Sequence, residues 1–152
     1  MTANENTQRA VEADFRQLVM LYARAMDRNE PDLLNDILTE DILLSGPGFS
    51  ISGIENVRAV PASLKERYAA TRHMVHNQTV TLDGNTAKGE TYSTASHAIK
   101  STNDGPEILV WEVRYQDQFR VHDGRWRISQ RELIIDWIET RAITFAAPLR
   151  SL

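Results

Sequence analysis

The sequence predicts an α+β fold in which helices pack on one face of a curved, mostly antiparallel sheet. Before residue 71, apolar residues recur at steps of three and four, which is typical of helices. From residue 71 onward the period is two, which is typical of strands. The turn sequences D-G-N, S-T-N-D-G-P and H-D-G separate the predicted strands. At 152 residues, the chain fits one domain over residues 1–152.

The first helix is predicted over residues 8–27, with residues 1–7 disordered before it. Its apolar stripe consists of Val11, Phe15, Leu18, Val19, Tyr22, Ala25 and Met26. A short second helix is predicted from Pro31, because proline suits the first turn of a helix. Residues 41–52 then predict two short strands joined by a Pro/Gly turn. The range 54–70 is helical in pattern, but Pro61 must kink or split that helix.

Four longer strands are predicted at residues 73–82, 87–100, 107–121 and 126–138, followed by a C-terminal tail at 140–152. The inner face of the second of these strands carries small residues, namely Ala87, Gly89, Thr91, Ser93 and Ala95, followed by His97. The next strand presents large apolar residues on one face, namely Leu109, Trp111, Val113, Tyr115, Phe119 and Val121, interrupted only by Asp117. A wall of large side chains opposite a floor of small ones predicts a hydrophobic pocket.

The alternation changes phase in the last strand. Trp126 and Ile128 share one face, whereas Leu133, Ile135 and Trp137 share the other. Such a change indicates a β-bulge, and bulges often re-aim a side chain near a site. Arg131 lies at this crossover, although a solvent-exposed arginine would explain its position equally well.

Composition excludes several classes of function. The net charge is −4 and no basic run occurs, so we expect no nucleic-acid partner. The absence of cysteine excludes disulfides and cysteine metal sites and fits a reducing compartment, for which we expect a cytoplasmic location. Residues 1–10 are polar and no stretch is long and apolar enough for a membrane span, so we expect neither a signal peptide nor a membrane partner. Because no glycine-rich phosphate loop occurs, we expect no cofactor.

His73 and His76 raise the question of a metal site. Neighbouring strand residues alternate between faces, so these two histidines point to opposite sides and we expect no bound metal. Alternation by itself slightly favours His76 as the inward-facing one, because it shares a face with Met74, Val80 and Leu82.

Two residues of the first helix also have alternative explanations. Asp27 lies at the C-terminal end of the helix, where the macrodipole disfavours an anion. A solvated carboxylate with no functional role would also explain this position. Tyr22 belongs to the apolar stripe and by default is part of the core.

Three motifs in this order resemble the SnoaL-like family of the nuclear-transport-factor-like α+β cone superfamily. They are Y-x-x-x-x-D at 22–27, H-M-V-H-N at 73–77 and W-R-I-S-Q-R at 126–131, and the order of elements is similar over residues 8–140. The resemblance implies a cone-shaped fold with a curved mixed sheet wrapped around three N-terminal helices. It also implies that His73, not His76, faces the pocket and pairs with Asp27, with Tyr22 and Arg131 as further catalytic residues. His97 corresponds to a second pocket histidine.

The family's enzymes imply a cofactor-independent lyase or isomerase of the dehydratase, hydratase or cyclase type. We expect an Asp–His acid–base pair acting on a hydrophobic polycyclic or aromatic small molecule. The expected substrate-binding residues are His97, Trp111, Tyr115 and Phe49. The sequence departs from the family's enzymes in lacking a lysine on the first helix and an aspartate on the second long strand, so the reaction itself stays open.

Two other functions fit the same resemblance, because the superfamily includes non-enzymes. The protein could be a non-catalytic binding protein for an apolar ligand, or a structural β-subunit of a ring-hydroxylating oxygenase. The resemblance also implies a homodimer or homotrimer, for which we expect an exposed sheet surface including Tyr92, Ile108 and Val110.

Overall fold

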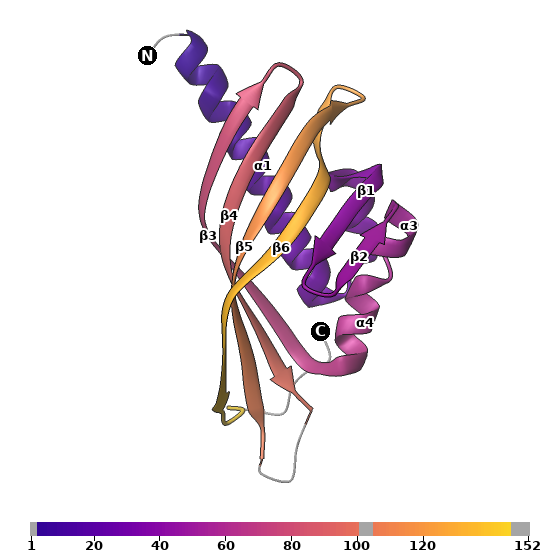
Figure 1. The fold of residues 1–152 in the computed structure, drawn as a ribbon, viewed down its shortest axis with the longest axis vertical. Coiled ribbons are helices and arrows are strands. Elements are labelled where there is room, and N and C mark those ends of the chain that lie inside the picture. The colour runs from indigo at the N-terminus through magenta and orange to yellow at the C-terminus, as the bar shows by residue number, and fades with distance from the viewer. Residues whose placement is uncertain (1–2, 101–104, 147–152) are drawn as a thin grey trace.

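The computed structural model describes residues 3–100 and 105–146 and confirms the α+β prediction (Figure 1). Its strands form one six-stranded sheet in the order β2-β1-β6-β5-β4-β3, in which only the β1–β6 pair is parallel. The helices are α1 (Ala3–Arg28), the 3₁₀ helix η1 (Pro31–Leu33), α2 (Leu34–Ile37), α3 (Ile54–Val57) and α4 (Val60–Arg67). The strands are β1 (Leu38–Gly46), β2 (Phe49–Ser52), β3 (Tyr68–Asp83), β4 (Thr86–Ile99), β5 (Glu107–His122) and β6 (Arg125–Ala142).

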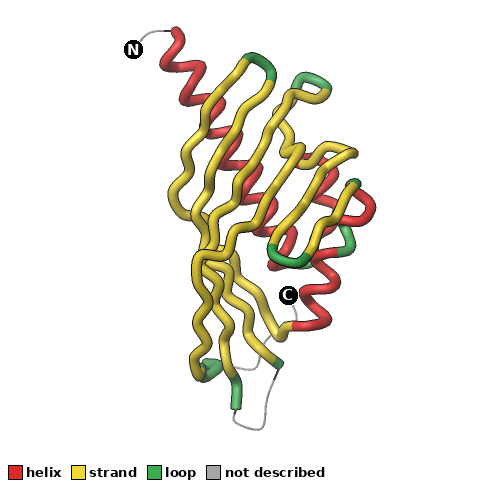
Figure 2. Tube along the Cα trace, viewed as in Figure 1, coloured by secondary structure: helices red, strands yellow, loops and turns green. Residues whose placement is uncertain are grey.

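Figure 2 shows the helices gathered on one face of the upper part of the sheet, which α1 crosses diagonally. The strands twist sharply about halfway along, and their lower ends extend beyond α1. None of the described helices is long and apolar enough to cross a membrane.

Most predicted elements are present, with shifted ends. The helix α1 begins at Ala3, five residues before its predicted start, and β3 begins at Tyr68 rather than at residue 73. Pro61 splits the helical range 54–70 as predicted, because it occupies the first turn of α4, where its missing N–H costs nothing. Strand β6 runs to Ala142, so the described part of the predicted tail that is not strand is 143–146; residues 147–152 lie outside the described residues.

The core lies between the apolar stripe of α1 and the upper half of the sheet. The Phe15 ring packs against Phe119 with a centroid distance of 4.3 Å and meets Trp126 edge-on at 5.0 Å. Other buried members of this cluster are Leu18, Tyr22, Ala25, Met26, Leu34, Ile37, Leu38, Ile42, Leu44, Val57, Ala87 and Ile128. The period of α1 therefore buries one stripe against the sheet, as the sequence predicts.

A β-bulge in β3 decides which histidine faces inward. Val75 pairs with Ser93 but Gln78 pairs with Thr91, so β3 has one extra residue between these two pairs. The bulge reverses the alternation, and His73 therefore faces the same side as Val80 and Leu82 despite the odd spacing. The inference from alternation that His76 faces inward is wrong, and His76 is exposed.

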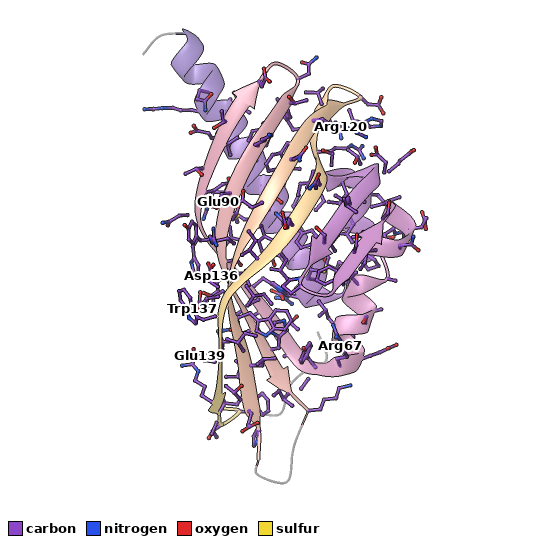
Figure 3. All side chains as sticks on the ribbon, in the orientation of Figure 1. Arg67, Glu90, Arg120, Asp136, Trp137 and Glu139 are labelled. Atoms are coloured by element: carbon purple, nitrogen blue, oxygen red, sulfur yellow. The ribbon has the colours of Figure 1, made fainter. Side chains whose placement is uncertain are left out.

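Strand β6 has two bulges, not one. Ser129 is the extra residue between the Gln118–Gln130 and Phe119–Ile128 pairs, which confirms the predicted phase change and turns Arg131 inward. A second extra residue, Asp136, reverses the alternation again. The prediction that Trp137 shares a face with Leu133 and Ile135 is wrong for this reason. Trp137 is 62% exposed, and Figure 3 shows it at the margin of the sheet with Asp136 and Glu139, away from α4.

The exposed surface predicted on the outer face of the sheet is only partly present. Tyr92 is exposed and Ile108 is half-buried, but Val110 is only 2% exposed. Its side chain is short and lies on a central strand, where the longer residues Glu112 and Glu139 flank it on the same face. Val110 therefore cannot contribute to an exposed surface.

We expect Phe15→Ala to lower the free energy of unfolding by about 3–5 kcal/mol, because it removes a fully buried ring and leaves a cavity in the core. Urea denaturation followed by circular dichroism measures the change. Met20→Ala on the same helix is the control, since Met20 is 48% exposed and should change stability by less than about 0.5 kcal/mol. Equal losses in the two variants would contradict the packing described here.

Candidate functional site

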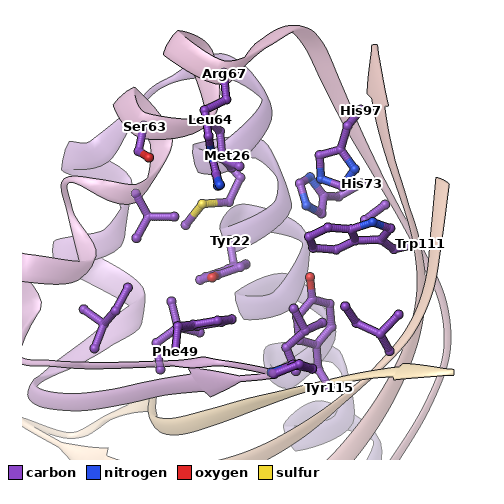
Figure 4. Close-up of a pocket in the computed structure, with 17 residues that line it drawn as sticks. Tyr22, Met26, Phe49, Ser63, Leu64, Arg67, His73, His97, Trp111 and Tyr115 are labelled. Carbon is purple, nitrogen blue, oxygen red and sulfur yellow. The ribbon is translucent and has the colours of Figure 1, made fainter. Parts of the chain in front are cut away.

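A cavity of about 380 Å³ lies between the C-terminal half of α1, α4, the β1–β2 hairpin and the sheet (Figure 4). It occupies the place predicted for a hydrophobic pocket: β4 contributes the small residue Ala95, whereas β5 contributes the large residues Trp111 and Tyr115. Its lining residues are Tyr22, Met26, Leu44, Pro47, Phe49, Ile51, Val60, Ser63, Leu64, Arg67, His73, Ala95, His97, Trp111, Tyr115, Leu133 and Ile135. The four expected substrate-binding residues are all in this lining.

Asp27 and His73 are in direct contact at one side of the cavity. The His73 Nδ1 lies 2.7 Å from Asp27 Oδ1, and the His73 backbone N–H donates to Oδ2 at 2.8 Å. The Thr71 hydroxyl donates to Oδ1 at 2.9 Å. Burial by itself would raise the pKa of Asp27, but the hydrogen bonds from His73 and Thr71 outweigh it and hold that pKa below its usual value.

The ionised state of Asp27 determines which ring nitrogen of His73 carries a proton. An ionised carboxylate has no hydrogen to donate, so Nδ1 of His73 must carry the proton of this hydrogen bond. In the neutral ring, Nε2 is then the acceptor, with a lone pair available to take a proton. Thr71, which sequence reasoning missed, adds a second donor beside the ring and holds the carboxylate in place.

His97 is the second histidine of the cavity, and it is buried. Its ring packs between Tyr68 at 4.6 Å and Trp111 at 4.7 Å, with the His73 ring 6.0 Å away. The Leu109 carbonyl can only accept, so His97 Nδ1–H donates to it at 3.3 Å. Burial, followed by the proximity of His73, lowers the pKa of His97 to about 4. His97 is therefore neutral near pH 7 and contributes a flat ring to the cavity wall.

Arg131 lies behind the cavity wall and is not one of its lining residues. It is 1% exposed, and its Nε and Nη2 donate to the two carboxylate oxygens of Asp117 at 2.8 and 2.7 Å. Its guanidinium lies 4.3 Å from the ring centroids of both Tyr22 and Tyr115. The alternative of a solvent-exposed arginine is therefore wrong.

Asp117 is the partner that sequence reasoning did not identify. The available signal was a single carboxylate on the otherwise apolar face of a central strand, which must be paired when it is buried. The bulge at Ser129 brings Arg131 directly opposite Asp117 in the β5–β6 register. Burial is also the largest reason why the pKa values of Tyr22 and Tyr115 are raised, that of Tyr115 to about 12, so both hydroxyls remain protonated donors at neutral pH.

A second, more polar groove of about 500 Å³ lies on the other side of the Asp27–His73 contact. Its lining residues are Arg16, Met20, Ala23, Arg24, Asp27, Arg28, His73 and Val75. His73 therefore borders both the apolar cavity and this open groove. Within the described residues, no group of three or more acidic or histidine side chains is arranged to hold a metal ion.

Comparisons with known proteins agree with this fold. A family model described as a SnoaL-like domain matches residues 8–132. No curated protein sequence matches significantly.

Several solved structures share the fold at low sequence identity. The type 2 hexachlorocyclohexane dehydrochlorinase LinA is 18% identical with a TM-score of 0.82, and the match covers 95% of this chain and 98% of that one. A Novosphingobium aromaticivorans protein provisionally named a scytalone dehydratase is 19% identical with a TM-score of 0.79, covering 95% and 97%. A Kribbella flavida protein is 21% identical with a TM-score of 0.78, covering 84% and 92%.

We expect Asp117→Asn to lower the free energy of unfolding by about 3–5 kcal/mol, because it leaves the buried Arg131 cation without its counter-charge. The matched control is Asp136→Asn, which breaks the more exposed bidentate pair with Arg114 and should cost less than about 1 kcal/mol. Urea denaturation of both variants measures the difference. Similar losses of stability in the two variants would show that the buried Asp117–Arg131 pair stabilises the fold no more than the more exposed Asp136–Arg114 pair does.

The lowered pKa of His97 predicts a pH-dependent stability. The unfolded imidazole binds a proton near pH 6.5, but the folded one does so near pH 4. Between these values the unfolded state binds more protons, so the free energy of unfolding should fall as the pH is lowered from 6.5 to 4.

His97→Gln should remove roughly 2–3 kcal/mol of this fall, as measured by urea denaturation at a series of pH values. His122→Gln is the control, because the His122 side chain is exposed. If the free energy of unfolding of His97→Gln depended on pH in the same way as that of the wild type, the lowered pKa of His97 would be refuted.

Proposed function

The chain belongs to the SnoaL-like domain family, and from this premise we propose that it is a cofactor-independent lyase or isomerase for a hydrophobic small molecule. The single observation that carries the proposal is the contact between Asp27 and His73 at the wall of an apolar cavity. A carboxylate that orients an imidazole beside a largely apolar space is suited to proton transfer at carbon.

In the proposed reaction, His73 Nε2 takes a proton from a carbon of the bound substrate. Asp27 holds the ring in the required tautomer and stabilises the imidazolium that forms. The electron pair of the broken C–H bond forms a double bond, and either a leaving group departs from the adjacent carbon or the double bond migrates. The imidazolium then returns the proton to the leaving group or to another carbon. Such positioning contributes a rate factor of about 10²–10⁴.

Tyr22 and Tyr115 are the proposed donors to an oxygen that gains negative charge during this reaction. Both line the cavity and both are protonated at neutral pH. Arg131 lies against their rings on the side away from the ligand, and its positive charge opposes the rise in their pKa values. We therefore assign Arg131 a positioning role, exerted through the two tyrosines, in place of a direct contact with substrate.

The proposed substrate has an aromatic or polycyclic body. The cavity wall includes the flat rings of Phe49, Trp111 and His97 and several aliphatic residues, among them Leu133 and Ile135. These surfaces favour a flat apolar ligand. Elimination is our leading reaction type, since one of the proteins with a similar fold is named a dehydrochlorinase and another is provisionally named a scytalone dehydratase.

The polar groove behind the pair gives His73 a second side that is open to solvent. We propose that the pair exchanges protons with bulk water through this groove, so that the substrate side of the ring stays dry. A dry cavity strengthens the interaction between the Asp27 charge and the imidazolium.

We also propose that the outer face of the sheet associates with further copies of the chain, as in a homodimer or homotrimer. The exposed side chains Met74, Tyr92 and Trp137 support this, because large apolar groups on one sheet face favour burial against a partner. Sedimentation of the wild type and of Trp137→Lys measures this association.

We expect His73→Ala and Asp27→Asn each to lower turnover by about 10²–10⁴-fold with the fold retained, since each removes half of the acid–base pair. A thermal-shift screen of steroid, polyketide and chlorinated-ring compounds first identifies ligands. Turnover and deuterium incorporation from heavy water at carbon are then followed by NMR.

His76→Ala is the matched control for this experiment. His76 lies on the same strand but is exposed, and its ring bonds to Thr94 on the face away from the cavity. Its turnover should equal that of the wild type. Unimpaired turnover in both His73→Ala and Asp27→Asn would end the proposal. Ligand binding with neither turnover nor proton exchange would favour a non-catalytic binding protein.

A further inference from the structure

Arg67 is the only permanently charged side chain among the described residues that line the cavity. It is the last residue of α4, and it is exposed. Figure 4 shows its side chain reaching down from α4 towards Met26, on the side of the cavity that also carries Leu64 and Ser63. No aspartate or glutamate is among the described residues that line the cavity, and the neighbouring His97 is neutral near pH 7.

Within the described residues, Arg67 has no carboxylate partner, although five other arginines do. Salt bridges join Arg24 to Glu30, Arg58 to Asp32, Arg114 to Asp136, Arg120 to Asp41 and Arg131 to Asp117. For Arg67, the contact found within the described part of the chain is with the Tyr68 ring, 5.6 Å from its guanidinium carbon. A cation at the end of a helix is favoured by the macrodipole, but this preference does not explain its direction towards an apolar cavity.

We propose that the ligand of this cavity is an apolar carboxylic acid whose carboxylate binds Arg67 at the cavity mouth. The inference rests on the proposed function, since it assigns a substrate class to the same site. A guanidinium offers a planar fork of N–H donors that matches the two oxygens of a carboxylate. The apolar body of the acid then extends into the cavity, whose wall includes His73 and Trp111.

The distribution of charge around the cavity supports this orientation. At the His73 side, the ionised Asp27 lies directly behind the imidazole and would repel a second carboxylate. Apart from the hydroxyls of Tyr22, Tyr115 and Ser63, the rest of the wall consists mainly of apolar and aromatic groups, and neutral hydroxyls stabilise a full carboxylate charge less than a guanidinium does. The acid group is therefore held at Arg67, and this fixes which end of the molecule reaches the Asp27–His73 pair.

The test compares two probes of the same shape and different charge, 1-naphthaleneacetic acid and 1-naphthaleneacetamide. Dissociation constants are measured by isothermal titration calorimetry at neutral pH and low ionic strength for the wild type, Arg67→Gln and Lys65→Gln. Lys65 is the matched control, because it lies on the same helix, is exposed and does not line the cavity. Each variant removes one positive charge, so a general effect of net charge appears equally in both.

We expect the wild type to bind the acid about tenfold more tightly than the amide. Arg67→Gln should bind both probes equally, whereas Lys65→Gln should keep the preference. Because Arg67 is exposed, high salt should reduce the wild-type preference. Thermal unfolding without ligand checks that each variant is folded.

Equal affinity of the wild type for the two probes, a preference that survives in Arg67→Gln, or no binding of either probe would overturn the proposal. These outcomes are independent of the acid–base chemistry. If the wild type converted a neutral compound and Asp27→Asn did not, the carboxylic acid would be refuted as the substrate class, and the proposed enzymatic activity would stand. If Arg67→Gln lost the preference for the acid while Asp27→Asn kept full turnover, the carboxylate site would stand and the proposed acid–base pair would be refuted.

Discussion

The contact between the end of α1 and the start of β3 is the interaction on which the site depends. Asp27 lies in the last turn of α1, where the helix macrodipole disfavours a negative charge. Hydrogen bonds from His73 and Thr71 offset this cost and lock the helix end to the strand. The Asp27 carboxylate thus fixes the position of the end of α1 and the tautomer of His73. It also holds in place the wall between the apolar cavity and the polar groove, both of which His73 borders.

A second constraint acts from behind the cavity wall. The guanidinium of Arg131 is held in plane by Asp117 and lies against Tyr22 and Tyr115. Burying this ion pair requires near-ideal geometry, and the bidentate bonds and two flanking rings supply it. The tyrosines are consequently fixed from one side, while their other side lines the cavity. The buried ion pair and the two tyrosine rings therefore link the stability of the sheet to the shape of the cavity.

Charge is distributed unevenly around the cavity, and this unevenness gives the site a direction. The carboxylate of Asp27 lies behind His73 at one side of the cavity and the guanidinium of Arg67 at its mouth, while much of the remaining wall is apolar or aromatic. Such a cavity orients a ligand that has both a polar and an apolar end better than one that is apolar throughout. In the proposed reaction, the polar groove behind His73 separates the route of protons from the space for substrate.

Much of this organisation is already determined by the sequence. The change of period before residue 71, the proline at position 61 and the small face of β4 opposite the large face of β5 are local patterns, and they predicted the helices, the sheet and the pocket. The motifs around Tyr22, His73 and Trp126 predicted the family, which the match over residues 8–132 confirms. The orientation of His73 was implied by the family resemblance against the simple alternation of the strand, and the tertiary structure shows the bulge that produces it. Only the tertiary structure decided that Arg131 pairs with Asp117 and that Trp137 turns outward. Each of these depends on a bulge, and a bulge is defined by the register with a neighbouring strand, which alternation within one strand does not contain.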